Sequence, residues 1–275
     1  MRPVLNTAQR SLVAVVRGAY AAQWSAPAEA VWRIADGFGV VELAIPAKQG
    51  GIGLEVLDWC LVAEELGARL GDPALIWQLL GYAETHCARG SDEEREAAAH
   101  TLRAVAGDGS GAVGRLSRGA VPAQFAQQAE DLEQVRHAAY TVGVGRRALE
   151  LARERAARRV VGGTALIERQ AVAHRVARAA FALQSARFEV YQAAWALEHT
   201  EAGSHLALTA LAAAGRAAVG AAHDAVQIFG AAGTSRADVV AVYRAAYRAA
   251  TAYGSPDRLW RAAADRRYRT AGAGP

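Results

Sequence analysis

The chain has 275 residues, enough for one large or two modest domains with a sizeable core. Its 31 basic and 27 acidic residues give a net charge of +4, and they are interspersed along the predicted helices. Because no basic block forms, this distribution argues against a nucleic-acid partner. The two cysteines lie in helical patterns, so no disulfide framework is indicated and we expect a cytoplasmic location.

The sequence gives no sign of a membrane segment or a metal site. Its first 20 residues have an amphipathic helical pattern, unlike a signal peptide. No stretch reaches the roughly 18 apolar residues that a membrane span needs. The seven histidines and two cysteines show no metal-ligand spacing. We therefore expect no membrane association and no bound metal.

Apolar residues recur at helical spacing through most of the chain. In the first part, a Ser91 cap followed by acidic residues predicts the start of one helix, and glycines and Pro46 break the pattern between two others. The stretch GDGSGAVGRLSRGAVP, residues 107–122, is glycine-rich and predicts a linker. The helices predicted before this linker lie near 7–23, 27–37, 55–70, 73–89 and 91–106.

Beyond the linker the pattern predicts an up-down helical bundle. A final short helix should begin at Pro256, because proline is favoured in the first helical turn. No stretch is a convincing strand, so the predicted fold class is all-α. We expect an N-terminal helical domain at 1–106 and a bundle at 123–275. The other bundle helices are predicted at about 123–160, 167–200, 204–230 and 236–252.

Three motifs resemble the acyl-CoA dehydrogenase family. IPAKQGGIGLEVLDWCLVAEELG resembles its N-terminal P-x-x-x-G-G-x-G pattern followed by an acidic-apolar helix. RVVGGTALIERQAVAHRVA resembles the family's R-x-x-F-G-x-x-(I/L)-x-x-x-Q-x-(V/I) segment, and DAVQIFGAAGTSR resembles its D-x-x-Q-(I/L)-x-G-G-x-G element. Their order and spacing agree with the family over about nine-tenths of the chain.

The resemblance implies a helical N-terminal domain and a C-terminal four-helix bundle that mediates oligomerisation. Members of the family carry a β-domain between these parts, which shelters the flavin ring and part of the acyl thioester. Here only residues 107–122 occupy that place. We therefore expect the middle β-domain to be absent.

An acyl-CoA dehydrogenase needs a carboxylate base that takes a proton beside the thioester while hydride leaves for FAD. In most members this base is the Glu of a Y-E-G-T turn. The resemblance places Tyr253 at that position, with Gly254 and Ser255 matching the two residues that follow. An ordinary phenol, with a pKa of about 10, is a poor proton acceptor near neutrality. Alternatively, Tyr253 only fills the cleft.

A second base position exists in the isovaleryl-type members, whose Glu lies on the long helix in a D-L-E-R-L context. Asp131, Leu132 and Glu133 match this pattern, and Gln134 replaces the Arg. Glu133 is thus the best candidate base. His137 lies one turn further on the same helical face, where it could share a proton with Glu133. The alternative is a solvated Glu133 paired with a neighbouring His or Arg.

Four residues correspond to flavin contacts of the family. By resemblance, Arg159 and Gln170 reach the cofactor of a neighbouring subunit, while Gln227 and Gly230 belong to the turn beside its pyrophosphate. The family's aromatic Phe is replaced by Gly162. Without a β-domain these residues could serve the bundle interface alone. We therefore expect FAD only through an oligomeric partner.

Three functions remain open. The first is a catalytically degenerate subunit that assembles with a full-length FAD-dependent acyl-CoA dehydrogenase. The second is a flavin-independent isomerase, dehydratase or cyclase that acts on an acyl or polyketide-like substrate with Glu133 as general base. The third, least favoured, is a working FAD dehydrogenase that forms a homo-oligomer.

Overall fold

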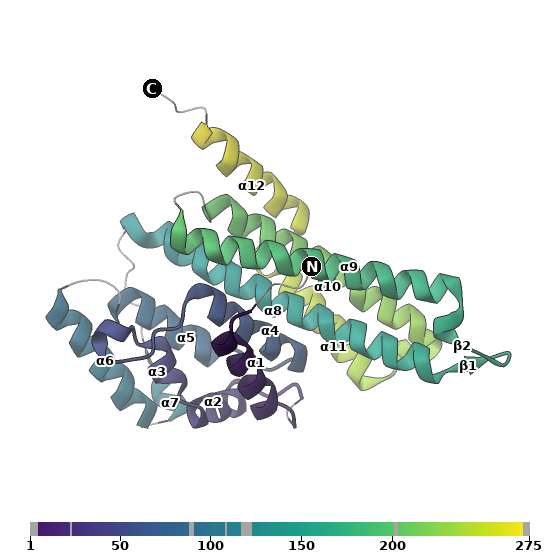
Figure 1. The fold of residues 1–275 in the computed structure, drawn as a ribbon, viewed down its shortest axis with the longest axis horizontal. Coiled ribbons are helices and arrows are strands. Elements are labelled where there is room, and N and C mark those ends of the chain that lie inside the picture. The colour runs from purple at the N-terminus through teal and green to yellow at the C-terminus, as the bar shows by residue number, and fades with distance from the viewer. Residues whose placement is uncertain are drawn as a thin grey trace.

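The computed structural model describes residues 5–22, 24–87, 91–107, 109–116, 123–200 and 203–271. It is 83% helical and 2% strand (Figure 1). The N-terminal elements are α1 (Thr7–Ala19), α2 (Ala28–Gly37), α3 (Val40–Ala44), the 3₁₀ turn η1 (Ala47–Gln49), α4 (Val56–Arg69), α5 (Ala74–Tyr82), the π-helical turn η2 (Ala83–Cys87), α6 (Asp92–Gly107) and α7 (Ser110–Val113).

The later elements begin with the longest helix. They are α8 (Ala123–Arg158), β1 (Val160–Val161), β2 (Thr164–Ala165), the 3₁₀ turn η3 (Leu166–Glu168), α9 (Gln170–His199), α10 (Gly203–Phe229), the 3₁₀ turn η4 (Gly230–Thr234), α11 (Ala237–Thr251) and α12 (Pro256–Ala271). Among the described residues the only strands are β1 and β2, which pair as an antiparallel hairpin. The all-α fold class is confirmed.

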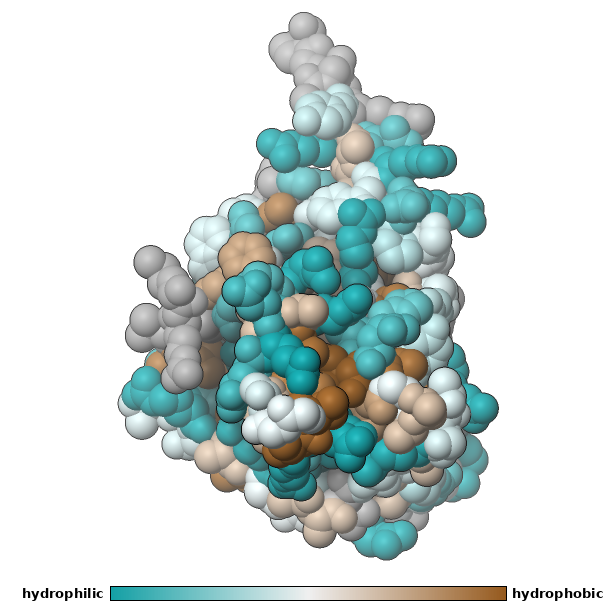
Figure 2. Space-filling model, turned by 90° about the vertical axis from the view of Figure 1, so that its right-hand side faces the viewer, coloured by the Kyte–Doolittle hydropathy of each residue, from teal (hydrophilic) through white to brown (hydrophobic). Residues whose placement is uncertain are grey.

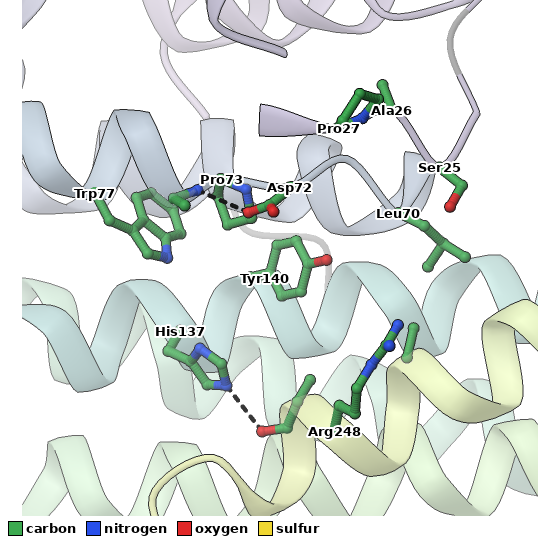
Figure 3. A pocket seen from close by; sticks show the side chains of 13 residues that line it. Ser25, Ala26, Pro27, Leu70, Asp72, Pro73, Trp77, His137, Tyr140 and Arg248 are labelled. Atoms are coloured by element: carbon green, nitrogen blue, oxygen red, sulfur yellow. Dashed lines mark hydrogen bonds between the residues drawn. The ribbon is translucent and has the colours of Figure 1, made fainter. Parts of the chain in front are cut away.

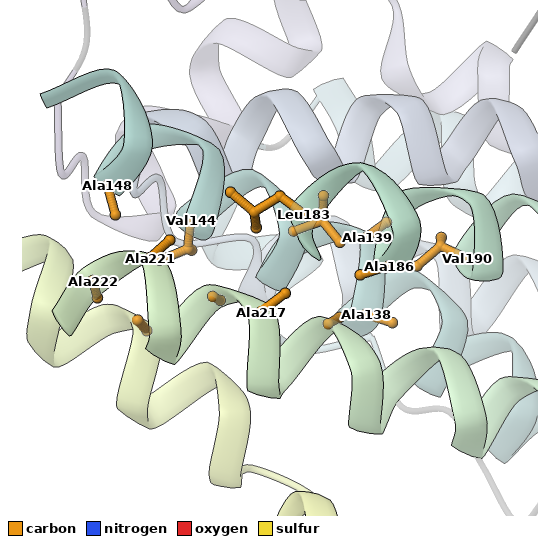
Figure 4. Close-up of a cluster of buried hydrophobic side chains, with 14 of the residues drawn as sticks. Ala138, Ala139, Val144, Ala148, Leu183, Ala186, Val190, Ala217, Ala221 and Ala222 are labelled. Carbon is orange, nitrogen blue, oxygen red and sulfur yellow. The ribbon is translucent and has the colours of Figure 1, made fainter. Parts of the chain in front are cut away.

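Helices α8 to α11 form a four-helix bundle, and α12 packs against α10 and projects from one end (Figure 1). Small side chains fill the bundle interior, so the helix backbones lie close together. Figure 4 shows that this core is mostly alanine, interrupted by larger side chains such as Leu183 and Val190. The alanine-rich composition thus supplies both helix propensity and tight packing.

The N-terminal helices are joined to the bundle where α4 crosses α8. A Cβ atom added at Gly67 would lie 2.0 Å from the Tyr140 carbonyl oxygen, and one added at Gly143 would lie 2.1 Å from the Glu64 carbonyl oxygen. Each glycine therefore gives room to the backbone of the other helix. This crossing holds the N-terminal helices against the middle of α8.

Two sequence signals of helix starts are confirmed. Ser91 accepts a hydrogen bond from the Glu94 backbone N–H at 3.2 Å, and the Glu94 carboxylate accepts one from the Ser91 N–H at 2.7 Å. This reciprocal pair caps α6. Pro256 opens α12, as proline's fixed φ favours.

The structure corrects several sequence predictions. The break at Gly162–Gly163 is a β-hairpin rather than a simple loop, because both glycines adopt positive φ. The final helix, α12, has 16 residues and is not short. Helix α1 ends at Ala19, before the predicted end at 23, and the predicted helix 73–89 changes to π-helix at Ala83. Residues 23 and 88–89 lie outside the described residues.

By length and composition α10 is the one candidate membrane span among the described residues, although it contains no unbroken run of 18 apolar residues. Gly203–Thr234, α10 with η4, meets that test with a mean hydropathy of 1.3 over its best window. However, 61% of that window is buried inside the protein. Helix α10 packs against α8, α9, α11 and α12, so its apolar character belongs to a core helix.

The middle β-domain is absent, as expected. Helix α7 ends at Val113 and α8 begins at Ala123, so only residues 114–122 connect them. The predicted linker is thus part helical, because α7 lies within it. Residues 108 and 117–122 of the linker lie outside the described residues.

Candidate functional site

The two residues predicted from the sequence as candidate base positions, Glu133 and Tyr253, face each other. Glu133 lies on α8, and Tyr253 follows the end of α11, 120 residues later. The Tyr253 hydroxyl donates a hydrogen bond to Glu133 Oε1 at 2.6 Å. Both side chains are half-buried. A phenol donor at this distance stabilises the carboxylate form and occupies one of its oxygens.

His137 completes the cluster. Its Nε2 lies 2.8 Å from the carbonyl oxygen of Ala249 on α11. Because a carbonyl only accepts, Nε2 carries the proton and donates it there. The His137 ring also meets Tyr253 edge-on, with centroids 5.1 Å apart. Burial lowers the pKa of His137, against the opposing effects of the Ala249 carbonyl and the Glu133 charge, so the ring is neutral at pH 7.

A cavity of about 550 Å³ adjoins this cluster through His137 (Figure 3). Trp77 of α5 lines one side, while Tyr140 of α8 and Arg248 of α11 lie opposite. Burial raises the pKa of Tyr140 to about 12; Asp72 adds to this effect and Arg248 opposes it. Tyr140 therefore stays protonated at neutral pH and can donate a hydrogen bond into the cavity.

A buried ion cluster lies beside the α4–α8 crossing. Arg146 of α8 contacts Glu64 at 2.8 Å and Glu65 at 2.9 Å, and Arg187 of α9 contacts Glu64 at 2.8 Å. Burial alone would raise the pKa of Glu65, but hydrogen bonds from Arg17 and Arg146 outweigh it and lower that pKa. These contacts tie α1, α4, α8 and α9 together, and their role is structural.

The sequence carries a signal for this ion cluster. Glu64 and Glu65 are the two acidic residues of the quoted E-E-L segment, and both side chains are buried. Two adjacent glutamates in an otherwise apolar helix predict buried cationic partners, since an unpaired buried charge is very costly. Which arginines pair with them depends on the packing of α4 against α8 and α9.

The predicted flavin contacts gather at the opposite end of the bundle. The Arg155 guanidinium lies over the Phe229 ring, 5.5 Å from its centroid, so the C-terminal ends of α8 and α10 are adjacent. The hairpin and the start of α9 lie at the same end (Figure 1). The predicted contacts there are all exposed; they are Arg159, Gln170, Gln227 and Gly230.

The two groups of candidate residues are far apart in one chain. Glu133 and Arg158 belong to one continuous helix, in which 25 residues span about 38 Å. The cluster at Glu133 therefore cannot share a reaction centre with Arg159 of the same chain.

FAD does not fit a single chain. The four predicted contacts are exposed, and the only sheet that the described residues place at this end is the two-stranded β1–β2 hairpin. A flavin held there alone would leave its ring in water. In the described part of the chain, no group of three or more His, Cys, Asp or Glu side chains could hold a metal ion.

Family models match both parts of the sequence. The model for the acyl-CoA dehydrogenase C-terminal domain matches residues 123–267, and the model for the N-terminal domain matches residues 3–103. The chain belongs to the acyl-CoA dehydrogenase family. Among curated proteins, no sequence matches significantly.

Solved structures of similar fold include other acyl-CoA dehydrogenases. The Tcur3481-Tcur3483 steroid ACAD G363A variant has a TM-score of 0.81 at 17% identity, covering 97% of this chain and 99% of that chain. The ChsE4-ChsE5 complex from Mycobacterium tuberculosis has a TM-score of 0.78 at 18% identity, with 100% of both chains covered. The FAD complex of PigA has a TM-score of 0.72 at 17% identity, covering 98% and 99%. At these identities the likeness establishes the fold alone.

Proposed function

We propose that this acyl-CoA dehydrogenase family member is a catalytically degenerate subunit that assembles with a full-length, FAD-dependent partner. The observation that carries this proposal is the distance of about 38 Å along α8 between Glu133 and the exposed flavin-contact positions. The exposed residues Arg159 and Gln227 can only contact a cofactor that another chain holds.

A second copy of this chain would not supply what is missing. Each copy lacks the β-domain that shelters a flavin ring, so a homo-oligomer lacks it too. A full-length partner brings both the β-domain and its own catalytic Glu. The ChsE4-ChsE5 structure, a complex of two differently named proteins that contains a chain of this fold, supports such an assembly.

The surface at the hairpin end favours a protein contact. Val160 and Val161 of β1 are 56% and 43% exposed. Figure 2 faces this end of the molecule and shows apolar side chains gathered in one area with hydrophilic side chains around it. An apolar patch with a polar rim is typical of a protein–protein interface.

The Glu133–Tyr253 pair supports loss of the dehydrogenase reaction in this chain. The phenol at the usual base position donates to the carboxylate at the alternative position. A carboxylate stabilised in this way is a weaker base towards a substrate C–H bond. The partner subunit would then perform the oxidation.

Co-expression tests this proposal. The chain would be produced alone and with each full-length acyl-CoA dehydrogenase of the source organism, then examined by native mass spectrometry and visible absorption. We expect a colourless chain alone and a yellow heteromer with one partner. A yellow homomer would contradict the proposal and support a self-sufficient FAD dehydrogenase.

Matched variants locate the cofactor contact. In the heteromer, Arg159→Ala together with Gln227→Ala should weaken FAD retention at least tenfold, because two polar contacts are lost. Arg153→Ala, which removes an exposed arginine six residues earlier on α8, should leave it unchanged. Equal FAD retention in both proteins would exclude the distal end of the bundle as the cofactor contact.

The second candidate is a flavin-independent enzyme with Glu133 as general base. The adjoining cavity and the paired proton acceptor and donor, Glu133 and Tyr253, favour it. Its test is exchange of the α-protons of acyl-CoA thioesters in D₂O, followed by NMR. This function predicts exchange by the colourless homomer, lost more than 100-fold in Glu133→Gln and kept in Glu130→Gln one turn earlier.

A further inference from the structure

The cavity beside His137 carries polar groups that neither proposed function uses. It lies between the N-terminal ends of α2 and α5 and the helices α8 and α11. Its volume of about 550 Å³ is within the range of sites that hold small organic molecules. Trp77 and Leu70 give it apolar walls, while Tyr140 and Arg248 provide donors.

The backbone around this cavity is strained. Among the described residues, Ser25 and Leu70 are the only non-glycine residues with positive φ, at +51° and +54°. Both line the cavity. The Ser25 N–H donates to the Arg69 carbonyl at 2.8 Å, which connects the two strained positions. Strained conformations of non-glycine residues concentrate at ligand sites, where the surrounding structure holds them.

Two donors in the cavity are available to a ligand. Neither the Arg248 guanidinium nor the Tyr140 hydroxyl makes a hydrogen bond or ion pair with a described residue. Figure 3 shows both groups directed towards the same part of the cavity. The raised pKa of Tyr140 keeps its hydroxyl protonated, as a donor should be.

The cavity also contains one acidic group, Asp72, which limits the charge of the ligand. Its carboxylate accepts a hydrogen bond from the Ala74 N–H at 3.0 Å, at the start of α5. Its charge repels anions, and Arg248 is the single positively charged side chain among the lining residues, because His137 is neutral. This balance favours a ligand with one negative charge over a phosphate ester with two.

We propose that this cavity binds a small organic carboxylate. The carboxylate pairs with the Arg248 guanidinium and accepts a hydrogen bond from Tyr140, while its apolar body lies against Trp77 and Leu70. The planar guanidinium matches the two oxygens of a carboxylate, and a neutral amide cannot replace that charge. All these residues belong to one chain, so the site does not depend on the partner proposed above.

The test uses the full chain and three carboxylates, butyrate, hexanoate and phenylacetate, each compared with its primary amide by isothermal titration calorimetry and saturation-transfer NMR. We expect at least one carboxylate to bind, and its amide to bind at least tenfold more weakly. Arg248→Gln should weaken carboxylate binding at least tenfold, and Tyr140→Phe about fivefold.

The matched control is Arg244→Gln. Arg244 is also exposed on α11, one turn earlier, and does not line the cavity. The Arg244→Gln variant should bind the carboxylate with the same affinity as the unaltered chain. The proposal is overturned if no carboxylate of the set binds, if the amide binds equally well, or if Arg248→Gln and Arg244→Gln have equal effects. Because Arg248 is exposed, its replacement keeps the test valid even where Tyr140→Phe fails to fold.

Discussion

The two halves of α8 have the same secondary structure and opposite surroundings. From Asp131 to Gly145 nearly every residue is buried, because α4 covers the face that the bundle leaves open. From Glu150 to Arg158 exposed residues recur, and the bundle covers one face alone. Polar side chains in the first half have partners within the chain, whereas those near the second end face outward. The covered half therefore contributes to the core, whereas the bare half has one face exposed.

The largest loss of stability should follow from a substitution in the ion cluster that attaches α4 to α8. In Glu64→Gln, Arg187 loses the carboxylate with which it pairs, and Arg146 keeps only its pairs with Glu65 and Glu150. We expect the free energy of unfolding to fall by about 3–5 kcal/mol. Denaturant unfolding of the purified chain measures it.

The control for that prediction is Glu150→Gln, at the start of the bare half. Glu150 pairs with Arg147 and Arg146 but is 46% exposed, so its loss should cost less than about 1 kcal/mol. Equal losses in the two variants would remove the distinction between the covered and bare halves.

A smaller effect should follow from one methyl group at the helix crossing. In Gly143→Ala the new Cβ would lie 2.1 Å from the Glu64 carbonyl oxygen, so α4 and α8 must separate. We expect a loss of about 2–3 kcal/mol in the free energy of unfolding, measured by the same method. The same replacement at Gly220, an exposed site of α10 with open space around it, should stabilise the protein by about 0.5–1 kcal/mol. An unchanged free energy of unfolding in Gly143→Ala would show that α4 and α8 can separate at this point without loss of stability.

The smallest effect concerns the protonation of His137. Burial lowers the pKa of His137 in the folded chain. In the unfolded chain the imidazole has an ordinary pKa near 6.5. Between these two pKa values the unfolded chain binds a proton at His137 and the folded chain does not. Stability should therefore fall as the pH drops below about 6.5, by no more than ~1.4 kcal/mol per pH unit for this one group.

His137→Gln tests this dependence, because glutamine can still donate to the Ala249 carbonyl but does not titrate. The charge of Glu133 and the hydroxyls of Tyr140 and Tyr253 remain in both proteins. Unfolding curves from pH 5 to 8 should show a weaker acid dependence in the variant. Identical pH profiles would mean that His137 binds its proton equally in the folded and unfolded chain.

The helical pattern and the caps at Ser91 and Pro256 could be predicted because they depend on residues close in the sequence. The candidate base positions at Glu133 and Tyr253, each taken from a separate motif, stay predictions, but the structure places the two side chains in contact. The hydrogen bond between Glu133 and Tyr253 could not be predicted, because it depends on how α11 lies along α8. No local sequence pattern specifies that packing. The positive φ of Leu70 was missed for a related reason: leucine gives no signal of a strained turn.

The short connection between Val113 and Ala123 also makes the chain suitable for domain grafting. Ten peptide steps of ~3.5 Å keep the two helix ends within ~35 Å of each other, and the α4–α8 crossing does not involve them. A folded module whose termini meet this distance could be inserted there without disturbing that crossing. A chimera that carries a relative's β-domain at this point would test whether a domain that shelters the flavin is enough to give the chain dehydrogenase activity.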